Sequence, residues 1–91
     1  MKATVVGLVT PHVLQIIDLA RNAEAGINVD WHLRATVVKT VSELGDQYNA
    51  HELLGAYIHG LEVAAKDVGQ ARKIYANVLQ TAATLAAATL R

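Results

Sequence analysis

Residues 74–90 of this chain read IYANVLQTAATLAAATL and contain no charged side chain, although the chain as a whole is 18% charged. A helix that lacks charge on every side is usually buried on every side. A chain of 91 residues has little protein of its own with which to cover such a helix. The segment therefore predicts contact with other chains.

An apolar stripe runs into this segment from upstream. Its positions recur at the heptad spacing of a coiled coil, and they are Leu54, Leu61, Val68, Tyr75, Ala82 and Thr89, with Tyr57, Ala64, Ala71, Val78 and Leu85 between them. If a turn separated two helices here, nothing would require the apolar positions of the second helix to continue the heptad spacing of the first. The pattern therefore predicts one helix over residues 50–90, about 60 Å long at 1.5 Å per residue.

Gly69 favours a different interpretation of the same stretch. Glycine in a helix interior costs about 1 kcal/mol relative to alanine, and the segment from Asp67 to Gln70 could end one helix and begin another. Two all-α architectures follow. A continuous helix gives two shorter helices packed on one long C-terminal helix, whereas a break near Gly69 gives a four-helix bundle.

The rest of the chain predicts two shorter helices and an arm. The helices are expected over residues 10–25 and 29–44, each with an apolar face at helical spacing. Residues 1–9 are rich in β-branched side chains and predict either a short strand or an extended arm that packs on a neighbour, and we expect the arm because a single strand has no partner in a helical chain. Residues 1–91 together are expected to form a single helical domain.

Short signals mark the ends of these helices. Thr10 can cap a helix N-terminus, and Pro11 suits the first helical position. Gly26 and Gly45 are placed to end the two helices. Asn49 can cap the next helix, with the Glu that follows three residues later completing a capping box.

The predicted apolar faces come from the same spacing. In the first helix the face comprises Val13, Ile16, Ile17, Ala20 and Ala23. In the second helix it comprises Trp31, Val37, Val38, Val41 and Leu44, opposite His32, Thr36, Lys39 and Glu43. In the long helix Ala56, Gly60 and Ala64 form a line of small side chains, which lets a second helix approach closely.

Composition excludes several classes of function. Lys plus Arg number eight and Asp plus Glu number eight, so the formal net charge of zero gives no general attraction to nucleic acid or to anionic lipid. The same neutrality removes repulsion between copies. No stretch offers about twenty apolar residues to span a bilayer, so we expect no membrane partner. Because the net charge is zero, we expect no nucleic-acid partner either.

No motif in the sequence commits the chain to a chemistry, and we expect no enzyme. Cysteine is absent, and Ser42 is the only serine. His51, Glu52, His59 and Glu62 could offer metal ligands, but the two histidines lie two helical turns apart and cannot both reach one ion from a straight helix. We therefore expect no metal, no cofactor and no catalytic residue, and the sequence indicates no compartment.

These observations predict a non-enzymatic, self-assembling helical protein, a subunit of a homo-oligomer, filament or shell. The expected self-association residues lie in the uncharged segment and are Tyr75, Val78, Leu79, Ala82, Ala83, Leu85, Ala86 and Leu90. The alternative is a small adaptor or regulator that binds a different protein through the same surface. The stoichiometry of either assembly is left open.

Overall fold

The computed structural model describes residues 4–68 and 70–89, and within them the chain forms four α-helices and no strand. The helices are α1 (Val5–Glu24), α2 (Asp30–Gly45), α3 (Ala50–Asp67) and α4 (Lys73–Thr89). The expected all-α helical bundle is confirmed. Of its two predicted forms, the four-helix bundle is right and the single helix over residues 50–90 is wrong, although Gly69 itself lies outside the described residues.

The chain reverses direction between α3 and α4 instead of continuing as one helix. A continuous helix would measure about 60 Å, whereas the longest dimension of the structure is 38 Å. The reversal lays α4 against all three other helices and covers its apolar side within one chain. The continuous heptad spacing did not reveal the turn between α3 and α4. Two separate helices that each bury an apolar stripe can keep the same seven-residue spacing across a short turn.

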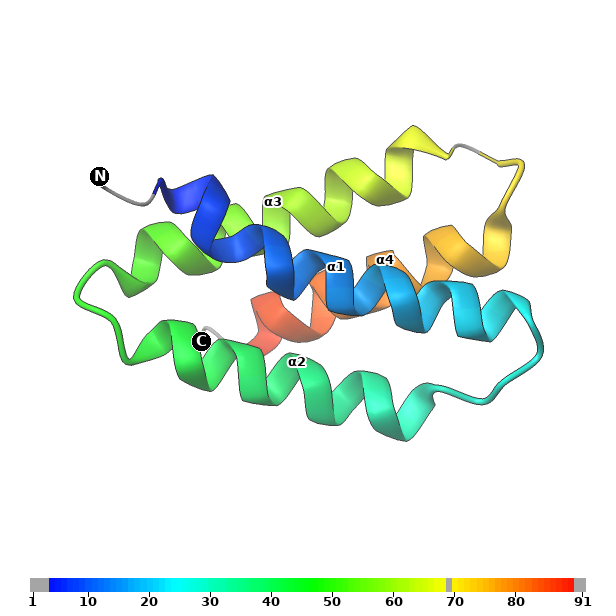
Figure 1. Ribbon diagram of the computed structural model, residues 1–91, viewed down its shortest axis with the longest axis horizontal. Helices are drawn as coiled ribbons and strands as arrows, with labels where there is room; N and C mark the ends of the chain where they lie inside the picture. Colours follow the sequence, from blue (N-terminus) through cyan, green and yellow to red (C-terminus); the bar gives the residue numbers. More distant parts are fainter. Residues whose placement is uncertain (1–3, 69, 90–91) are drawn as a thin grey trace.

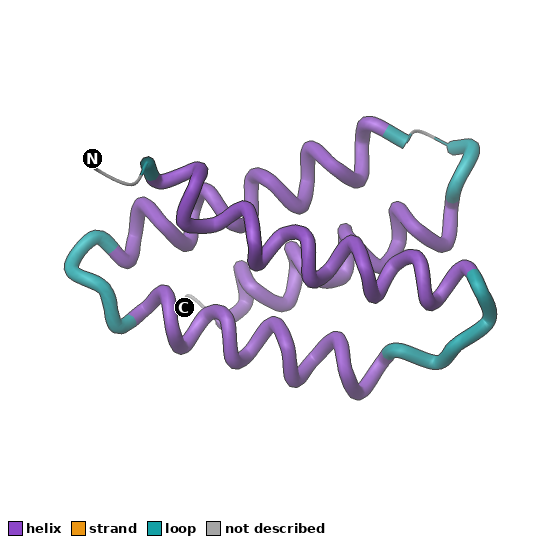
Figure 2. The backbone as a smooth tube through the Cα atoms, viewed as in Figure 1, coloured by secondary structure: helices purple, strands orange, loops and turns teal. Residues whose placement is uncertain are grey.

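Successive helices run in opposite directions (Figure 1). In this view α1 lies in front, α4 behind, α2 along the lower edge and α3 along the upper edge, and short turns join the helix ends (Figure 2). Helices α1 and α4 pack on each other across the centre of the bundle. Helix α2 packs least extensively on the others, so much of its surface faces outward.

Helix α1 begins earlier than the sequence suggested. The side chain of Thr4 accepts a hydrogen bond from the Gly7 amide at 2.9 Å, and it caps a helix that starts at Val5. The predictions of an arm over residues 1–9 and of a helix start at Thr10 are therefore wrong for the described part of that segment. Pro11 lies inside the helix, where it removes one backbone hydrogen bond. We attribute the longer helix to this cap and to burial of Val9 in the core.

The other helix ends lie close to their predicted positions. Gly26 has φ of 91°, and the Ile27 amide donates to the Asn22 carbonyl at 3.0 Å, which closes α1 in a Schellman motif. Helix α2 matches the predicted range to within one residue, and α3 begins directly after Asn49. The Asn49 side chain makes no capping hydrogen bond, so the predicted capping box is absent.

The core lies where the four helices meet. The predicted face of α1 is confirmed, because its members are buried or partly buried against the core. The line of small residues on α3 also packs as expected, since a Cβ atom built on Gly60 would lie 3.2 Å from Cγ2 of Val13. Close contact between α1 and α3 at this point depends on the absence of a side chain.

Candidate interaction surface

The residues predicted for self-association lie mostly inside the bundle. Tyr75, Leu79, Ala82, Ala83 and Ala86 are buried in the core of the single chain. Val78 and Leu85 are partly buried against that core, and Leu90 lies outside the described residues. The apolar side of α4 is therefore covered within one chain, and self-association through this segment stays a prediction.

The outward face of α4 carries small polar side chains. Asn77, Gln80 and Thr84 are exposed, and the Thr84 hydroxyl donates a hydrogen bond to the Gln80 carbonyl at 3.0 Å. Beside them a shallow groove of about 290 Å³ runs against Ile58 and Glu62 of α3. Ile74, at the start of α4, is the large apolar side chain that the described part of this helix exposes, at 56%.

The outward face of α2 carries a second apolar stripe. Trp31 is 80% exposed and Val38 is 59% exposed. Ala35 and Ser42 complete the stripe at the 31, 35, 38, 42 spacing, which alternates steps of four and three residues as in a helix–helix seam. An open concavity of about 740 Å³ lies over the stripe, and its remaining lining residues are Arg34, Lys39 and Glu43.

The prediction that Trp31 and Val38 belong to the apolar, core-facing side of α2 is wrong. The residues that this helix buries are Leu33, Val37, Thr40, Val41 and Leu44. The sequence contained a signal for the correct orientation of α2, because the spacing of those five buried residues already places them on one side of a helix. Once they are grouped, Trp31 and Val38 remain as a separate stripe on the opposite side.

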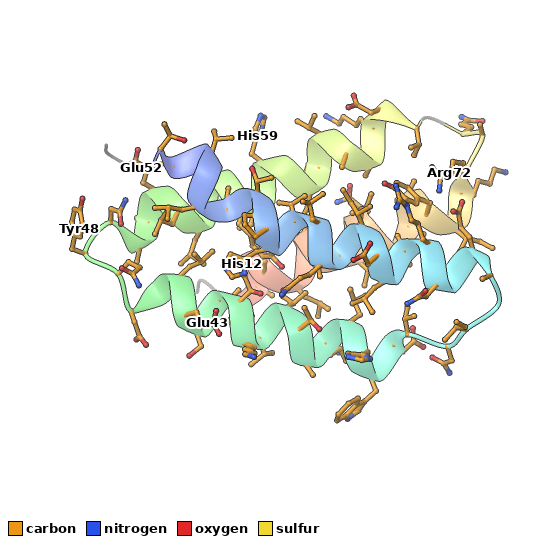
Figure 3. The ribbon with its side chains drawn as sticks, in the orientation of Figure 1. His12, Glu43, Tyr48, Glu52, His59 and Arg72 are labelled. Atoms are coloured by element: carbon orange, nitrogen blue, oxygen red, sulfur yellow. The ribbon has the colours of Figure 1, made fainter. Side chains whose placement is uncertain are left out.

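Two exposed aromatic side chains, Trp31 and Tyr48, lie at opposite ends of α2. Trp31 is the only tryptophan of the chain, and its ring lies 6.2 Å from that of His32. Tyr48 is fully exposed and projects from the turn that follows α2 (Figure 3). Tryptophan and tyrosine are enriched in protein interfaces, because they bury a large area with few rotatable bonds.

A buried polar cluster lies between α1, α2 and α3. Tyr57 is fully buried, and neither its hydroxyl nor Nδ1 of His12 has a hydrogen-bond partner among the described residues. The His12 and Tyr57 rings meet edge to face with centroids 6.5 Å apart. Burial raises the pKa of Tyr57 to about 12, and the Thr40 side chain opposes that rise although its position does not satisfy the geometry of a hydrogen bond to the phenol. Neither of the two unpartnered atoms is accessible to a substrate in this structure.

Arg72 joins the end of α1 to the start of α4. Its Nε donates to Oε2 of Glu24 at 2.9 Å, and its Nη2 donates to the other carboxylate oxygen. Its guanidinium also lies 3.9 Å above the ring of Tyr75. The Arg72 contact holds the pKa of Glu24 below its usual value and raises the pKa of Arg72. These contacts tie the start of α4 to the end of α1, and Figure 3 labels Arg72 at this end of the bundle.

Within residues 4–68 and 70–89, the structure brings together no group of three or more His, Cys, Asp or Glu side chains that could hold a metal ion. In the same part of the chain, no helix has both the length and the hydropathy to span a bilayer. Comparison with protein-family models, with curated proteins and with solved structures found no match.

Proposed function

We propose that this chain is a non-enzymatic helical protein that associates with itself through the outward face of α2. The observation that carries the proposal is the exposed stripe of Trp31, Ala35, Val38 and Ser42 on the most peripheral helix of the bundle. The proposal keeps the role expected from the sequence and moves the contact surface from α4 to α2.

The energetics of the stripe support contact with another helix. A tryptophan side chain can bury roughly 150–250 Å², which at about 25 cal/mol per Å² corresponds to several kcal/mol of apolar burial. This gain acts against the loss of translational and rotational freedom on association. The formal net charge of zero adds no repulsion between two copies.

Sedimentation of the purified protein over a dilution series tests the proposal. We expect a mass above that of the monomer at high concentration, and dissociation on dilution. The fluorescence of Trp31 reports the same equilibrium, because it is the only tryptophan. Its emission should shift to shorter wavelength as association removes the indole from water.

Val38→Glu is the variant that should abolish association, because it places a charge in the middle of the stripe. Val63→Glu is the matched control, since Val63 is a 40% exposed valine on α3. The control should keep the wild-type mass. A wild-type protein that remains a monomer with unshifted emission would contradict the proposal and favour the alternative, a helical adaptor for a different protein.

A further inference from the structure

We infer that two copies of this chain can exchange α4, with α3 and α4 of each copy joined into one straight helix that spans two bundles. In this swapped dimer, α4 of one copy takes the place of α4 in the other. The surface that the second copy covers is therefore the one that α4 already covers within a single chain. Exchange of an identical element is a low-cost route to a dimer, because it reuses contacts that the monomer makes. The exchange does not depend on the proposed contact through α2.

The buried faces of α3 and α4 lie in the same direction around the helix axis when the chain between them is straightened. A straight helix turns by about 100° per residue, and on a projection with that angle the buried residues of both helices fall within a sector of about 120°. These residues are Leu53, Leu54, Tyr57, Leu61 and Ala65 of α3, and Tyr75, Leu79, Ala82, Ala83 and Ala86 of α4. One continuous helix would thus present both buried faces on the same side, each to its own bundle.

The packing of α3 against α4 suits the same exchange. The two helices are antiparallel neighbours, and α4 also packs on α1 and α2 (Figure 1). In the swapped dimer the two long helices run antiparallel, so that α3 of each copy meets α4 of the other. Each bundle then contains α1, α2 and α3 of one copy with α4 of the second copy, and its core is the core of the monomer.

The described ends of the turn between α3 and α4 carry weak stop signals for a helix. At the start of the turn, Val68 keeps right-handed helical angles, with φ of −83° and ψ of −12°. At its end, the Ala76 amide donates to the Arg72 carbonyl at 2.9 Å, but the Arg72 guanidinium contacts Glu24 and does not cap α4. The turn after α1 differs, because Gly26 has φ of 91° and interrupts the helix there.

The helix propensity at position 69 opposes the swapped form in the wild type. Gly69→Ala makes a helix through this position about fivefold more favourable, and a dimer contains two such helices, so the constant for forming the swapped dimer should rise about 25-fold. We expect the native wild type to stay closed, because α4 must leave three helices before it can exchange. Exchange should therefore take place during refolding at high protein concentration.

The experiment uses chains that carry Val38→Glu, so that pairing through α2 does not contribute. The wild-type turn and Gly69→Ala are each refolded from urea at millimolar concentration, diluted and analysed by sedimentation. We expect Gly69→Ala to give a dimer that survives dilution, and the wild-type turn to give less of it. The control adds two alanines after Gln70 in the Gly69→Ala chain. This insertion keeps helix propensity but rotates α4 by about 200° relative to α3 in a straight helix, so the control should stay monomeric.

A distance within one chain distinguishes the swapped dimer from any other dimer. Spin labels on Glu52→Cys and Thr84→Cys suit this measurement, because both side chains are exposed and the chain has no cysteine of its own. In the closed bundle both labels lie in the half where α3 begins and α4 ends, and their separation is comparable to the bundle width of 24 Å. In the swapped helix they lie about 48 Å apart. An excess of unlabelled chains during refolding removes distances between copies.

Three results would overturn the exchange. They are a folded Gly69→Ala protein that stays monomeric, a dimer in which the distance within one chain stays short, and an insertion control that dimerises equally well. If Gly69→Ala fails to fold, the wild-type turn decides instead: a dimer with the long distance supports the exchange, and a monomer alone overturns it. None of these results depends on whether wild-type chains pair through α2, which the dilution series tests separately.

Discussion

Tyr57 shows how a single residue in this core resists prediction. Its place in a helical apolar stripe predicts burial, and the structure confirms that the side chain is fully buried. The sequence does not show that the hydroxyl lacks a partner, because this depends on where α1 and α2 place His12 and Thr40. Burying a hydroxyl without a hydrogen bond destabilises a fold by roughly 1–3 kcal/mol.

The raised pKa of Tyr57 predicts a loss of stability at alkaline pH. The phenol ionises near pH 10 in the unfolded chain and at about 12 in the folded one. Its contribution is therefore fully present below pH 10 and is lost as the pH rises towards 12, with a slope of up to about 1.4 kcal/mol per pH unit. Urea unfolding from pH 8 to pH 12 measures this slope.

Tyr57→Phe separates this contribution from the titration of other groups. The variant should be at least as stable as the wild type at neutral pH, because it removes a hydroxyl that has no partner. It should also lose less stability between pH 10 and pH 12. Tyr48→Phe is the control, because it makes the same substitution at a fully exposed tyrosine. Equal slopes for Tyr57→Phe and the wild type would contradict the assignment.

Among the helices, α2 shows what a pattern can and cannot predict. Its range follows from the sequence to within one residue, because glycines and capping residues act locally. Its orientation in the bundle was predicted wrongly, because the helix carries two apolar stripes and spacing alone does not say which one meets the core. The same ambiguity hid the turn between α3 and α4, where folding back buries more apolar surface than a straight helix would.

Two glycines of α3 provide a matched test of the helix packing. A Cβ at Gly55 would meet nothing within 4 Å, whereas one at Gly60 would lie 3.2 Å from Val13. Gly55→Ala should therefore stabilise the fold by about 1 kcal/mol through helix propensity. Gly60→Ala should gain clearly less, or lose stability, because Val13 must shift to admit the methyl group. Chemical denaturation of both variants measures the difference, and equal gains would show that α1 does not approach α3 closely at Gly60.

For the whole molecule, the sequence predicted the architecture better than the surface. The absence of charge over residues 74–90 predicted burial on every side, whereas α4 buries one side within the bundle and leaves residues such as Ile74, Gln80 and Thr84 exposed. It could not indicate whether the covering helices come from the same chain or from another. The exposed stripe on α2 became visible only once the bundle showed which face of that helix the core already occupies.

Self-association through α2 predicts that thermal stability depends on protein concentration. Because only the folded chain can present the stripe, pairing stabilises the native state by mass action. The unfolding midpoint of the wild type should therefore rise by a few degrees for each tenfold increase in concentration. Val38→Glu should unfold at one temperature at every concentration, whereas Val63→Glu should retain the dependence. Differential scanning calorimetry measures all three proteins, and a wild-type midpoint that does not change with concentration would show that the α2 stripe faces water in the free protein.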